Sequence, residues 1–209
     1  MVIIYGIPDT VRQLLKKPLI EKNRNSSLAR GTIGELTVLY KLSELDDNYH
    51  VFCDVKIRLD RNVRHRGGPL RNARIDFVVV SKRGVFCIEV KNWSDEYLSK
   101  ELVRQKKYGG FLPHMQAERN GMVLYLELSG FLFFLERRNQ GVYPNVINVL
   151  LATHGNMKYD PDYRVNVKDL SNINTFIQNR PEKSSDKVVQ EIVEDLKVMY
   201  LKRRRRNML

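Results

Sequence analysis

Residues 75 to 91 constrain the fold more than any other stretch, because two largely apolar runs stand there with only a short polar break between them. The runs are residues 75–80 and 85–90, and the break is Ser81-Lys82-Arg83-Gly84. Val, Ile and Phe favour strands and a glycine with positive φ suits a tight turn, so the pattern predicts a β-hairpin. Odd and even positions are apolar alike. Strands of this kind are buried on both faces, in the middle of a sheet covered by helices.

Three ionisable residues, Asp76, Glu89 and Lys91, interrupt this hairpin, and unpaired charge is costly to bury. A loop formed by Lys82-Arg83, or by all four residues of the break, sets Asp76 directly opposite Glu89. Lys91 follows two residues after Glu89 and therefore points to the same face. A three-residue loop would shift the register by one and turn Asp76 away.

These side chains suit a site for a divalent cation. Two facing carboxylates and a nearby backbone carbonyl, such as that of Val90, offer the oxygen ligands that Mg²⁺ or Mn²⁺ prefers, with room for water and a phosphate. Lys91 would orient a metal-bound water or stabilise charge that develops on the phosphate. The alternative is a buried salt-bridge network in which Asp76 and Glu89 pair with Lys91 and nearby arginines.

A helix is expected from residue 26 or 27 to about residue 45, with leucines along one face. Glu35 falls on this apolar stripe and needs a partner, either an arginine beside the helix or the metal ion. Gly31 and Gly34 each weaken a helix by about 1 kcal/mol relative to Ala. They indicate close approach by the sheet or by a nucleic-acid strand, unless the helix begins only near Thr32.

At these residues the chain resembles the PD-(D/E)xK nuclease superfamily, whose signature is an Asp on one central strand and Glu-x-Lys on the next. Within it the chain is most similar to nuclease-related (NERD) domains, over about residues 28 to 155. The likeness rests on Gly31-Thr32-Ile33-Gly34-Glu35, Ile75-Asp76-Phe77-Val78-Val79-Val80, Gly84-Val85-Phe86-Cys87-Ile88-Glu89-Val90-Lys91-Asn92 and Gln116-Ala117-Glu118-Arg119-Asn120. The chain departs from the pattern at Ile75, where the superfamily has Pro, and in the basic segment between Trp93 and Gln116. It also looks like archaeal Holliday-junction resolvases, which share the acidic plan and work as dimers.

The resemblance implies an α/β fold: an α/β/α sandwich with a central mixed sheet of the restriction-endonuclease-like type, plus extra N- and C-terminal helices. Residues 145–153 form a near-continuous apolar run that fits a further buried strand of this sheet. The catalytic residues implied are Asp76, Glu89, Lys91, Glu35 and Gln116, and the metal ligands implied are Asp76, Glu89, Val90 and Glu35.

Gln116 enters this set by resemblance. From the residues alone, Gln116 and Asn120 are an ordinary polar pair one turn apart on a helix that starts at Pro113. An amide in that position can also hydrogen-bond the catalytic lysine or a substrate phosphate.

The charge balance favours a polyanionic partner, because 36 Lys and Arg against 24 Asp and Glu give a formal net charge of +12. Five of these excess charges lie in residues 202–206, so the body of the chain is basic too. Residues 60–72 read as an arginine- and glycine-rich loop, either a plain surface loop or a flap that grips phosphate. The candidate nucleic-acid-binding residues are Arg61, Arg64, Arg66, Arg71, Arg74, Arg104, Lys106, Lys107, Arg203, Arg204, Arg205 and Arg206.

Cys53 and Cys87 lie in apolar runs far apart in the sequence, which indicates core thiols in a reducing cytosol. The chain shows no signal-peptide pattern, and its longest apolar stretch is shorter than the roughly 20 residues that a membrane span needs. We therefore expect a cytoplasmic protein, in the host cell if the origin is viral, with no membrane partner. Trp93, the only tryptophan, is expected to close the core rather than to stack on a base.

A length of 209 residues predicts a single domain. Its expected parts are an N-terminal helical extension (1–25, with a short helix after residue 9 or 10), a nuclease-like core (26–180), and a C-terminal helix with a basic tail (181–209). The apolar stripe of the last helix would pack on the core or on a second copy of the chain, which leaves a homodimer open. The tail would be a disordered arm for nucleic acid.

Taken together, the sequence predicts a Mg²⁺- or Mn²⁺-dependent nuclease that hydrolyses phosphodiester bonds of DNA. Two alternatives stay open. One is a structure-specific endonuclease like the Holliday-junction resolvases, and the other is a non-catalytic basic nucleic-acid-binding protein whose charged cluster is only structural.

Overall fold

The computed structural model describes residues 1–8, 27–66, 68–108, 112–139, 146–154, 157–158 and 160–206. The short helix expected after residue 9 or 10 lies outside these ranges. Of the N-terminal extension, residues 1–8 are described, and they carry strand β1 (Ile3–Tyr5).

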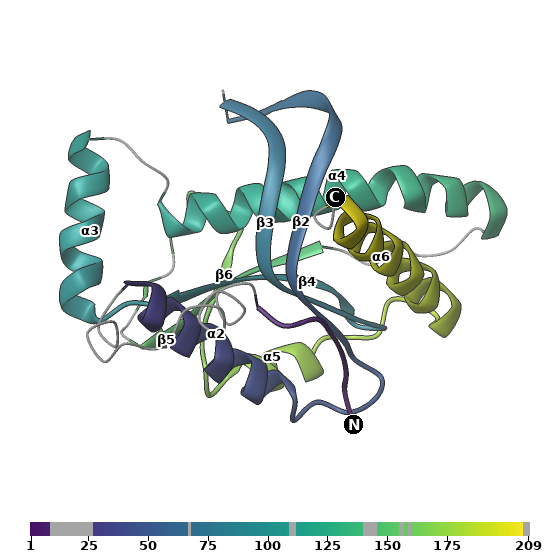
Figure 1. Ribbon diagram of the computed structural model, residues 1–209, viewed down its shortest axis with the longest axis horizontal. Helices are drawn as coiled ribbons and strands as arrows, with labels where there is room; N and C mark the ends of the chain where they lie inside the picture. The colour runs from purple at the N-terminus through teal and green to yellow at the C-terminus, as the bar shows by residue number, and fades with distance from the viewer. Residues whose placement is uncertain are drawn as a thin grey trace.

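Six strands form one mixed sheet in the order β1-β2-β3-β4-β5-β6 (Figure 1). After β1 come β2 (His50–His65), β3 (Gly68–Ser81), β4 (Gly84–Asn92), β5 (Val146–His154) and β6 (Asn166–Asp169). Strands β2, β3 and β4 are antiparallel neighbours, whereas β1 pairs parallel with β2, and β4, β5 and β6 run parallel. Strand β5 confirms the run predicted at 145–153. The edge strands β1 and β6 are additions that the sequence did not indicate.

Helices cover both faces of this sheet, which confirms the predicted α/β/α sandwich of the restriction-endonuclease-like type (Figure 1). Helices α4 (Pro113–Asn139) and α6 (Asp186–Arg206) pack on one face. Helices α2 (Ser27–Leu42) and α5 (Ile173–Gln178) pack on the other. Helix α3 (Asp95–Tyr108) follows directly after β4.

Strands β3 and β4 form the predicted hairpin in the predicted register. Ser81 pairs with Gly84 across a two-residue loop, and Gly84 has the positive φ, 137°, that suits glycine. Phe77 faces the core under α2 and α5, while Val78 faces the core under α4 and α6. Both faces of the hairpin are therefore buried, as its uninterrupted apolar character requires.

The pair β2–β3 turns a corner at Asp54 and Asp76. Cys53 pairs with Phe77 and both belong to the core under α2, whereas Val55 pairs with Ile75 and packs in the core under α4. Residues two apart on a regular strand share a face, so the strands must twist sharply between these pairs. Asp54 has a φ of 53°, a left-handed conformation that Asp tolerates better than most residues.

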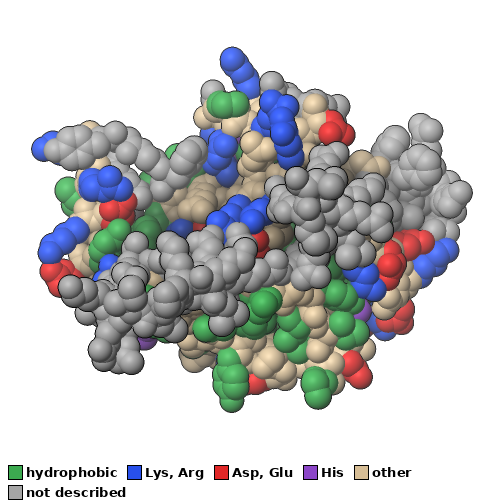
Figure 2. Space-filling model, viewed as in Figure 1, with side chains coloured by type: hydrophobic (Ala, Val, Ile, Leu, Met, Phe, Trp, Pro, Cys, Tyr) green, Lys and Arg blue, Asp and Glu red, His purple; other side chains and the backbone are tan. Residues whose placement is uncertain are grey.

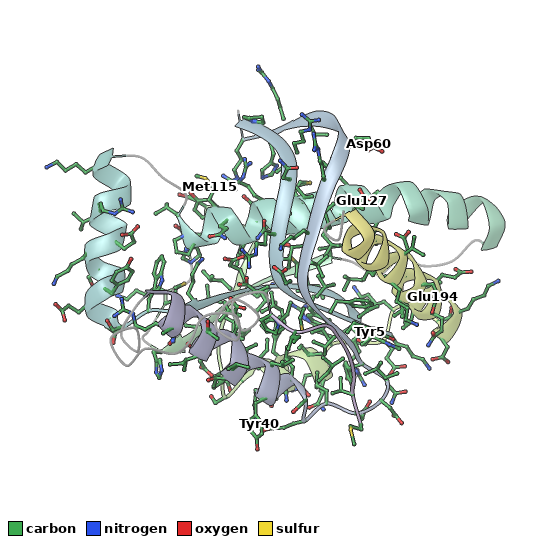
Figure 3. All side chains as sticks on the ribbon, viewed as in Figure 1. Tyr5, Tyr40, Asp60, Met115, Glu127 and Glu194 are labelled. Atoms are coloured by element: carbon green, nitrogen blue, oxygen red, sulfur yellow. The ribbon has the colours of Figure 1, made fainter. Side chains whose placement is uncertain are left out.

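Beyond this corner the two strands continue as a ribbon that stands off the sheet, and we call residues 55–75 the β2–β3 arm (Figure 1). The prediction of a loop at 60–72 was therefore wrong. Leu70 and Ala73 are buried toward the body of the molecule, while Arg71 and Asn72 are exposed. The polar residues that suggested a loop therefore lie on the solvent-exposed side of a two-stranded ribbon. Figure 3 places Asp60 near the outer end of the arm.

The apolar stripe of helix α6, expected to pack either on the core or on a second copy of the chain, packs on the core. Val189, Ile192, Val193 and Leu196 are buried against the sheet, with Met199 packed beside them. The helix also continues through Arg206, so the basic segment 202–206 is helical and the expectation of a disordered arm was wrong. Cys53 and Cys87 are buried free thiols, as predicted.

Helix α2 begins at Ser27, so Gly31 and Gly34 both lie inside it and the alternative start near Thr32 was wrong. A methyl group added at Gly34 would lie 2.6 Å from Cβ of Asn92 at the end of β4. Asn92 cannot easily retreat, because its amide donates to the Arg30 carbonyl (2.6 Å) and accepts from Thr153 (2.8 Å). The sheet is therefore the neighbour that requires glycine at residue 34.

We predict that Gly34→Ala lowers the free energy of unfolding by about 1–3 kcal/mol through overpacking, although alanine favours helix. Gly31→Ala is the matched control. A methyl group there meets no described atom within 4 Å outside the adjoining helix backbone, so the substitution should be neutral or stabilising by up to about 1 kcal/mol. Urea unfolding of both variants measures the difference. Equal stabilities would contradict the close packing of α2 on β4.

Candidate active site

The candidate site lies where β3 and β4 part. Their ladder ends at the pair Phe77–Ile88, and one residue further along, Oδ2 of Asp76 accepts a hydrogen bond from the backbone N–H of Val90 at 2.7 Å. The side chain of Asp76 thus replaces the backbone partner that β3 would otherwise offer. Because N–H and C=O of a strand residue point to the same side, the Val90 carbonyl also faces Asp76.

Glu89 and Lys91 lie next to each other on the face of β4 that α4 covers. Nζ of Lys91 is 2.8 Å from Oε1 of Glu89 and 2.9 Å from Oε1 of Gln116. Glu89 is only 3% exposed, so its charge is held by these contacts rather than by water. The amide expected to hydrogen-bond the lysine, that of Gln116, does so.

Asn120 is a site residue that the sequence reasoning did not select. Its Nδ2 donates to Oε2 of Glu89 at 2.9 Å and to the carbonyl of Arg74 at 2.8 Å, and the residue is buried. The feature of the sequence that could have pointed to Asn120 is its position one helical turn after Gln116, which puts both amides on the same face of α4. That spacing alone could not show that this face turns toward β4.

Glu35 of α2 lies close enough to Asp76 to affect its ionisation. Burial is the main cause that raises the pKa of Asp76 well above its usual value, and repulsion by Glu89 and Glu35 adds to it. The Val90 N–H and Lys91 oppose this rise without overcoming it. Asp76 therefore lies within electrostatic range of two further carboxyl groups, in a buried place where a bound cation would favour its ionised form.

A cavity of about 730 Å³ opens beside this cluster. It is lined by Val90 and Lys91 of the site and by Trp93, which is partly exposed and lies with its ring 5.5 Å from Nζ of Lys91. The prediction that Trp93 closes the core was therefore wrong. The tryptophan follows the last residue of β4, where the chain leaves the sheet, so its ring reaches the cavity instead.

The candidate nucleic-acid-binding Lys and Arg residues differ in whether their side chains are exposed on the surface or paired with an acid. Arg64 and Arg71 are exposed on the β2–β3 arm and Lys107 is exposed on α3. Arg74 pairs with Asp54 at 2.8 Å, and Arg104 with Glu101 at 2.5 Å. The side chains of Arg61, Lys106, Arg203, Arg204, Arg205 and Arg206 lie outside the described parts of the structure. Figure 2 shows Lys and Arg side chains on the arm and on α3, on either side of a hollow.

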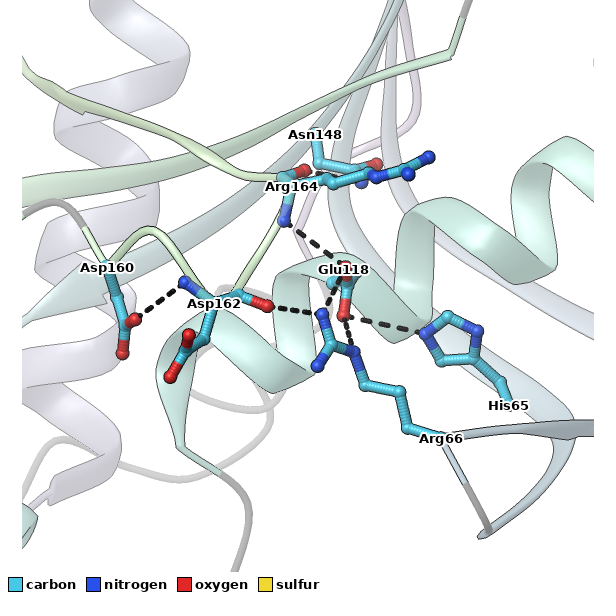
Figure 4. A network of polar contacts seen from close by, with 7 residues as sticks. All are labelled: His65, Arg66, Glu118, Asn148, Asp160, Asp162 and Arg164. Carbon is cyan, nitrogen blue, oxygen red and sulfur yellow. Dashed lines mark hydrogen bonds and ion pairs between the residues drawn. The ribbon is translucent and has the colours of Figure 1, made fainter.

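Arg66, another candidate, ties the tip of the arm to α4 (Figure 4). Its Nε and Nη2 lie 2.6 Å and 3.1 Å from the two carboxylate oxygens of Glu118, and Nη2 also donates to the carbonyl of Asp162. His65 and the backbone N–H of Arg164 contact the same carboxylate, at 3.5 Å and 3.2 Å. Glu118 stands between Gln116 and Asn120 on α4, so this anchor connects the arm to the helix that holds the site.

The oxygen donors of Asp76, Glu89, Glu35 and the Val90 carbonyl are of the type that Mg²⁺ and Mn²⁺ accept. Oδ2 of Asp76 takes the Val90 bond, and both oxygens of Glu89 accept hydrogen bonds from Lys91 and Asn120. Within the described ranges, no three His, Cys, Asp or Glu side chains are already arranged to hold a metal ion.

A curled, mixed sheet between helices, with two acids and a lysine where its central strands part, defines a protein of the restriction-endonuclease-like class. The family model of the nuclease-related domain matches residues 30–151, more than half of the chain, so the chain belongs to that family. Membership indicates a nuclease-related function and nucleic acid as the partner. No curated protein matches the chain. In the described parts of the structure, no helix combines the length and apolar character needed to cross a membrane.

We predict that Glu118→Gln lowers the midpoint of thermal unfolding at pH 7 by about 2–4 °C. Burial alone would raise the pKa of Glu118, but the hydrogen bonds and charge of Arg66, with those of Arg164 and His65, lower it below the usual value. A lowered folded pKa means that ionised Glu118 stabilises the protein above about pH 4.5, and that this contribution is lost as the pH falls through the folded pKa.

The difference between wild type and Glu118→Gln should therefore shrink as the pH is lowered from 7 toward 3, measured by thermal unfolding at each pH. Glu44→Gln is the control, because Glu44 is 46% exposed in an i,i+3 pair with Lys41, and such pairs contribute little. A difference that grows on acidification would refute the anchoring role of Glu118.

Proposed function

We propose that this protein is a nuclease that hydrolyses phosphodiester bonds of DNA with the help of Mg²⁺ or Mn²⁺. The observation that carries the proposal is the placement of Asp76, Glu89 and Lys91 together at the point where β3 and β4 part. The Val90 N–H holds Asp76, and Gln116 and Asn120 of α4 hold the Glu89–Lys91 pair. A purely structural salt bridge between Glu89 and Lys91 would need neither a buried second carboxyl group, that of Asp76, nor a cavity beside the ammonium.

In this proposal Asp76, Glu89 and the carbonyl of Val90 hold the ion, and Glu35 assists or holds a second one. When bound, the ion polarises a phosphoryl oxygen and lowers the pKa of a water molecule. Asn120 keeps Glu89 oriented through its 2.9 Å hydrogen bond, because a carboxylate that can rotate freely is a poor ligand.

Lys91 provides the positive charge next to the phosphate. Gln116 and Glu89 fix its Nζ at 2.9 Å and 2.8 Å, so the ammonium is oriented before the substrate arrives. A pre-oriented charge stabilises the transition state without the cost of reorganisation. We assign Lys91 to water orientation or transition-state stabilisation, and Gln116 to positioning of Lys91.

DNA as the substrate is supported by charge and shape. The net charge of +12 favours a polyanion, and the hollow between the β2–β3 arm and α3 has exposed cations on both sides (Figure 2). Arg64 and Arg71 on the arm would contact the phosphate backbone, which contributes affinity and strong salt dependence rather than sequence preference.

We predict that Lys91→Ala and Asp76→Asn each reduce metal-dependent cleavage of DNA by a factor of about 10²–10⁴, while DNA affinity measured without metal changes little. Asp76→Asn keeps an oxygen for the Val90 N–H, so its fold should persist. Lys41→Ala, in the last turn of α2 where Lys41 pairs with Glu44, is the control and should cleave as wild type does. Wild-type cleavage should stop in EDTA and return with Mg²⁺ or Mn²⁺.

The same assay separates the remaining alternatives. Linear, flapped and four-way-junction DNA are compared as substrates, and preferred cutting of the junction would indicate a resolvase-like enzyme. Cleavage that survives both substitutions would refute the assigned site. Salt-sensitive DNA binding without cleavage under any metal would indicate a non-catalytic nucleic-acid-binding protein.

A further inference from the structure

The cavity beside Lys91 is larger than the hydrolysis of a phosphodiester requires. Its volume of about 730 Å³ lies between the first turns of α2, the end of β4 and the beginning of α3. Pockets that enclose small organic ligands span about 300–1,000 Å³. The reacting phosphate needs only the mouth of this cavity at Lys91, so the remaining space is available to the part of the substrate attached to that phosphate.

Two aromatic side chains form one wall of the cavity. The rings of Trp93 and Tyr97 meet edge to face, with centroids 5.4 Å apart and an angle of 66° between their planes. Trp93 is partly exposed and Tyr97 is 45% exposed. Large aromatic rings that remain open to solvent inside a cavity are a surface on which a flat ligand can stack.

Gly31 of α2 and Asn92 at the end of β4 also line the cavity. Among the described residues outside the adjoining helix backbone, no heavy atom lies within 4 Å of the position that a Cβ would take at Gly31, in contrast to Gly34. Asn92 is held in place, since its amide donates to the Arg30 carbonyl and accepts from Thr153. The cavity is therefore open at Gly31 and has a fixed side chain at Asn92.

Three cations and one acid line the cavity. Lys100 of α3 is 73% exposed and pairs with Glu96 at 2.6 Å, and Lys91 pairs with Glu89. Arg30 is exposed on the α2 side, so the lining offers positive charge to an anionic group. A ligand that is flat and apolar in one part and anionic in another fits this combination, as a nucleotide does.

We infer that this cavity is a binding site for an unpaired nucleobase of DNA, stacked on Trp93, in the nucleotide whose phosphate lies at Lys91. The inference rests on the proposed function for the placement of that phosphate. A base within a duplex is stacked and paired, so it could enter only after unstacking, which costs a few kcal/mol. The preferred substrate is therefore single-stranded DNA or a single-stranded segment next to a duplex.

The test uses the fluorescence of Trp93, the only tryptophan in the chain, in EDTA so that no cleavage occurs. The full chain is titrated with an oligothymidylate and with an abasic oligonucleotide that carries the same number of phosphates. Stacking predicts quenching by the oligothymidylate and little quenching by the abasic strand, because only the first has bases. A blunt duplex of the same length should quench less than the single strand.

Anisotropy of labelled strands then measures affinity. Trp93→Ala should weaken binding of the oligothymidylate roughly 5- to 150-fold, the range for loss of one stacked base, and leave the abasic strand within about twofold. Trp93→Phe should restore most of the affinity. Tyr40→Ala, an exposed aromatic at the far end of α2 (Figure 3), is the matched control and should change neither.

Equal quenching by both strands, or an equal or absent effect of Trp93→Ala on their affinities, would overturn the nucleobase site. Failure of the wild type to bind either strand would overturn it together with DNA as substrate. Normal base-dependent quenching in a protein that cleaves no DNA under any metal would refute the nuclease proposal and leave the nucleobase site standing.

Discussion

The parting of β3 and β4 at Asp76 is the constraint on which the candidate site depends. A regular ladder would give the N–H of Val90 a backbone partner, but the corner at Asp54 and Asp76 turns β3 away and the Asp76 carboxylate takes that place. The same turn exposes one edge of β4 just where Glu89 and Lys91 emerge. One change of strand direction therefore creates the opening and supplies the first acid for it.

The charges in this opening are balanced by neighbours of two kinds. Lys91 offsets part of the negative charge of Glu89 and Asp76, and α4 contributes two amides rather than further charges. Amides orient a carboxylate or an ammonium without changing the net charge. The pKa of Asp76 is raised mainly by burial, and the neighbouring carboxyl groups of Glu89 and Glu35 add to the rise. A fold that had evolved only for stability would gain by replacing one of these acids.

The sequence was sufficient for features set by local geometry. The two-residue turn at Lys82 and Arg83 fixes the register, and the alternation of a strand fixes the shared face of Glu89 and Lys91. It was insufficient where distant segments decide the outcome. The Arg66–Glu118 pair joins residues 52 positions apart, and the faces presented by Asn120 and Trp93 depend on how α4 and the end of β4 pack. The arm was misread because an exposed two-stranded ribbon and a loop share the same polar composition.

The β2–β3 arm has a buried side and an exposed side. Its buried side packs on α4 through residues such as Leu70 and Ala73, and its tip is held to α4 by the pair of Arg66 with Glu118. Its outward residues take no part in the central sandwich. The exposed side of the arm can therefore vary in sequence, whereas its buried side cannot. Substitutions confined to outward residues such as Arg64 and Arg71 would change the surface that the arm presents and leave its packing on α4, and with it the candidate site, intact.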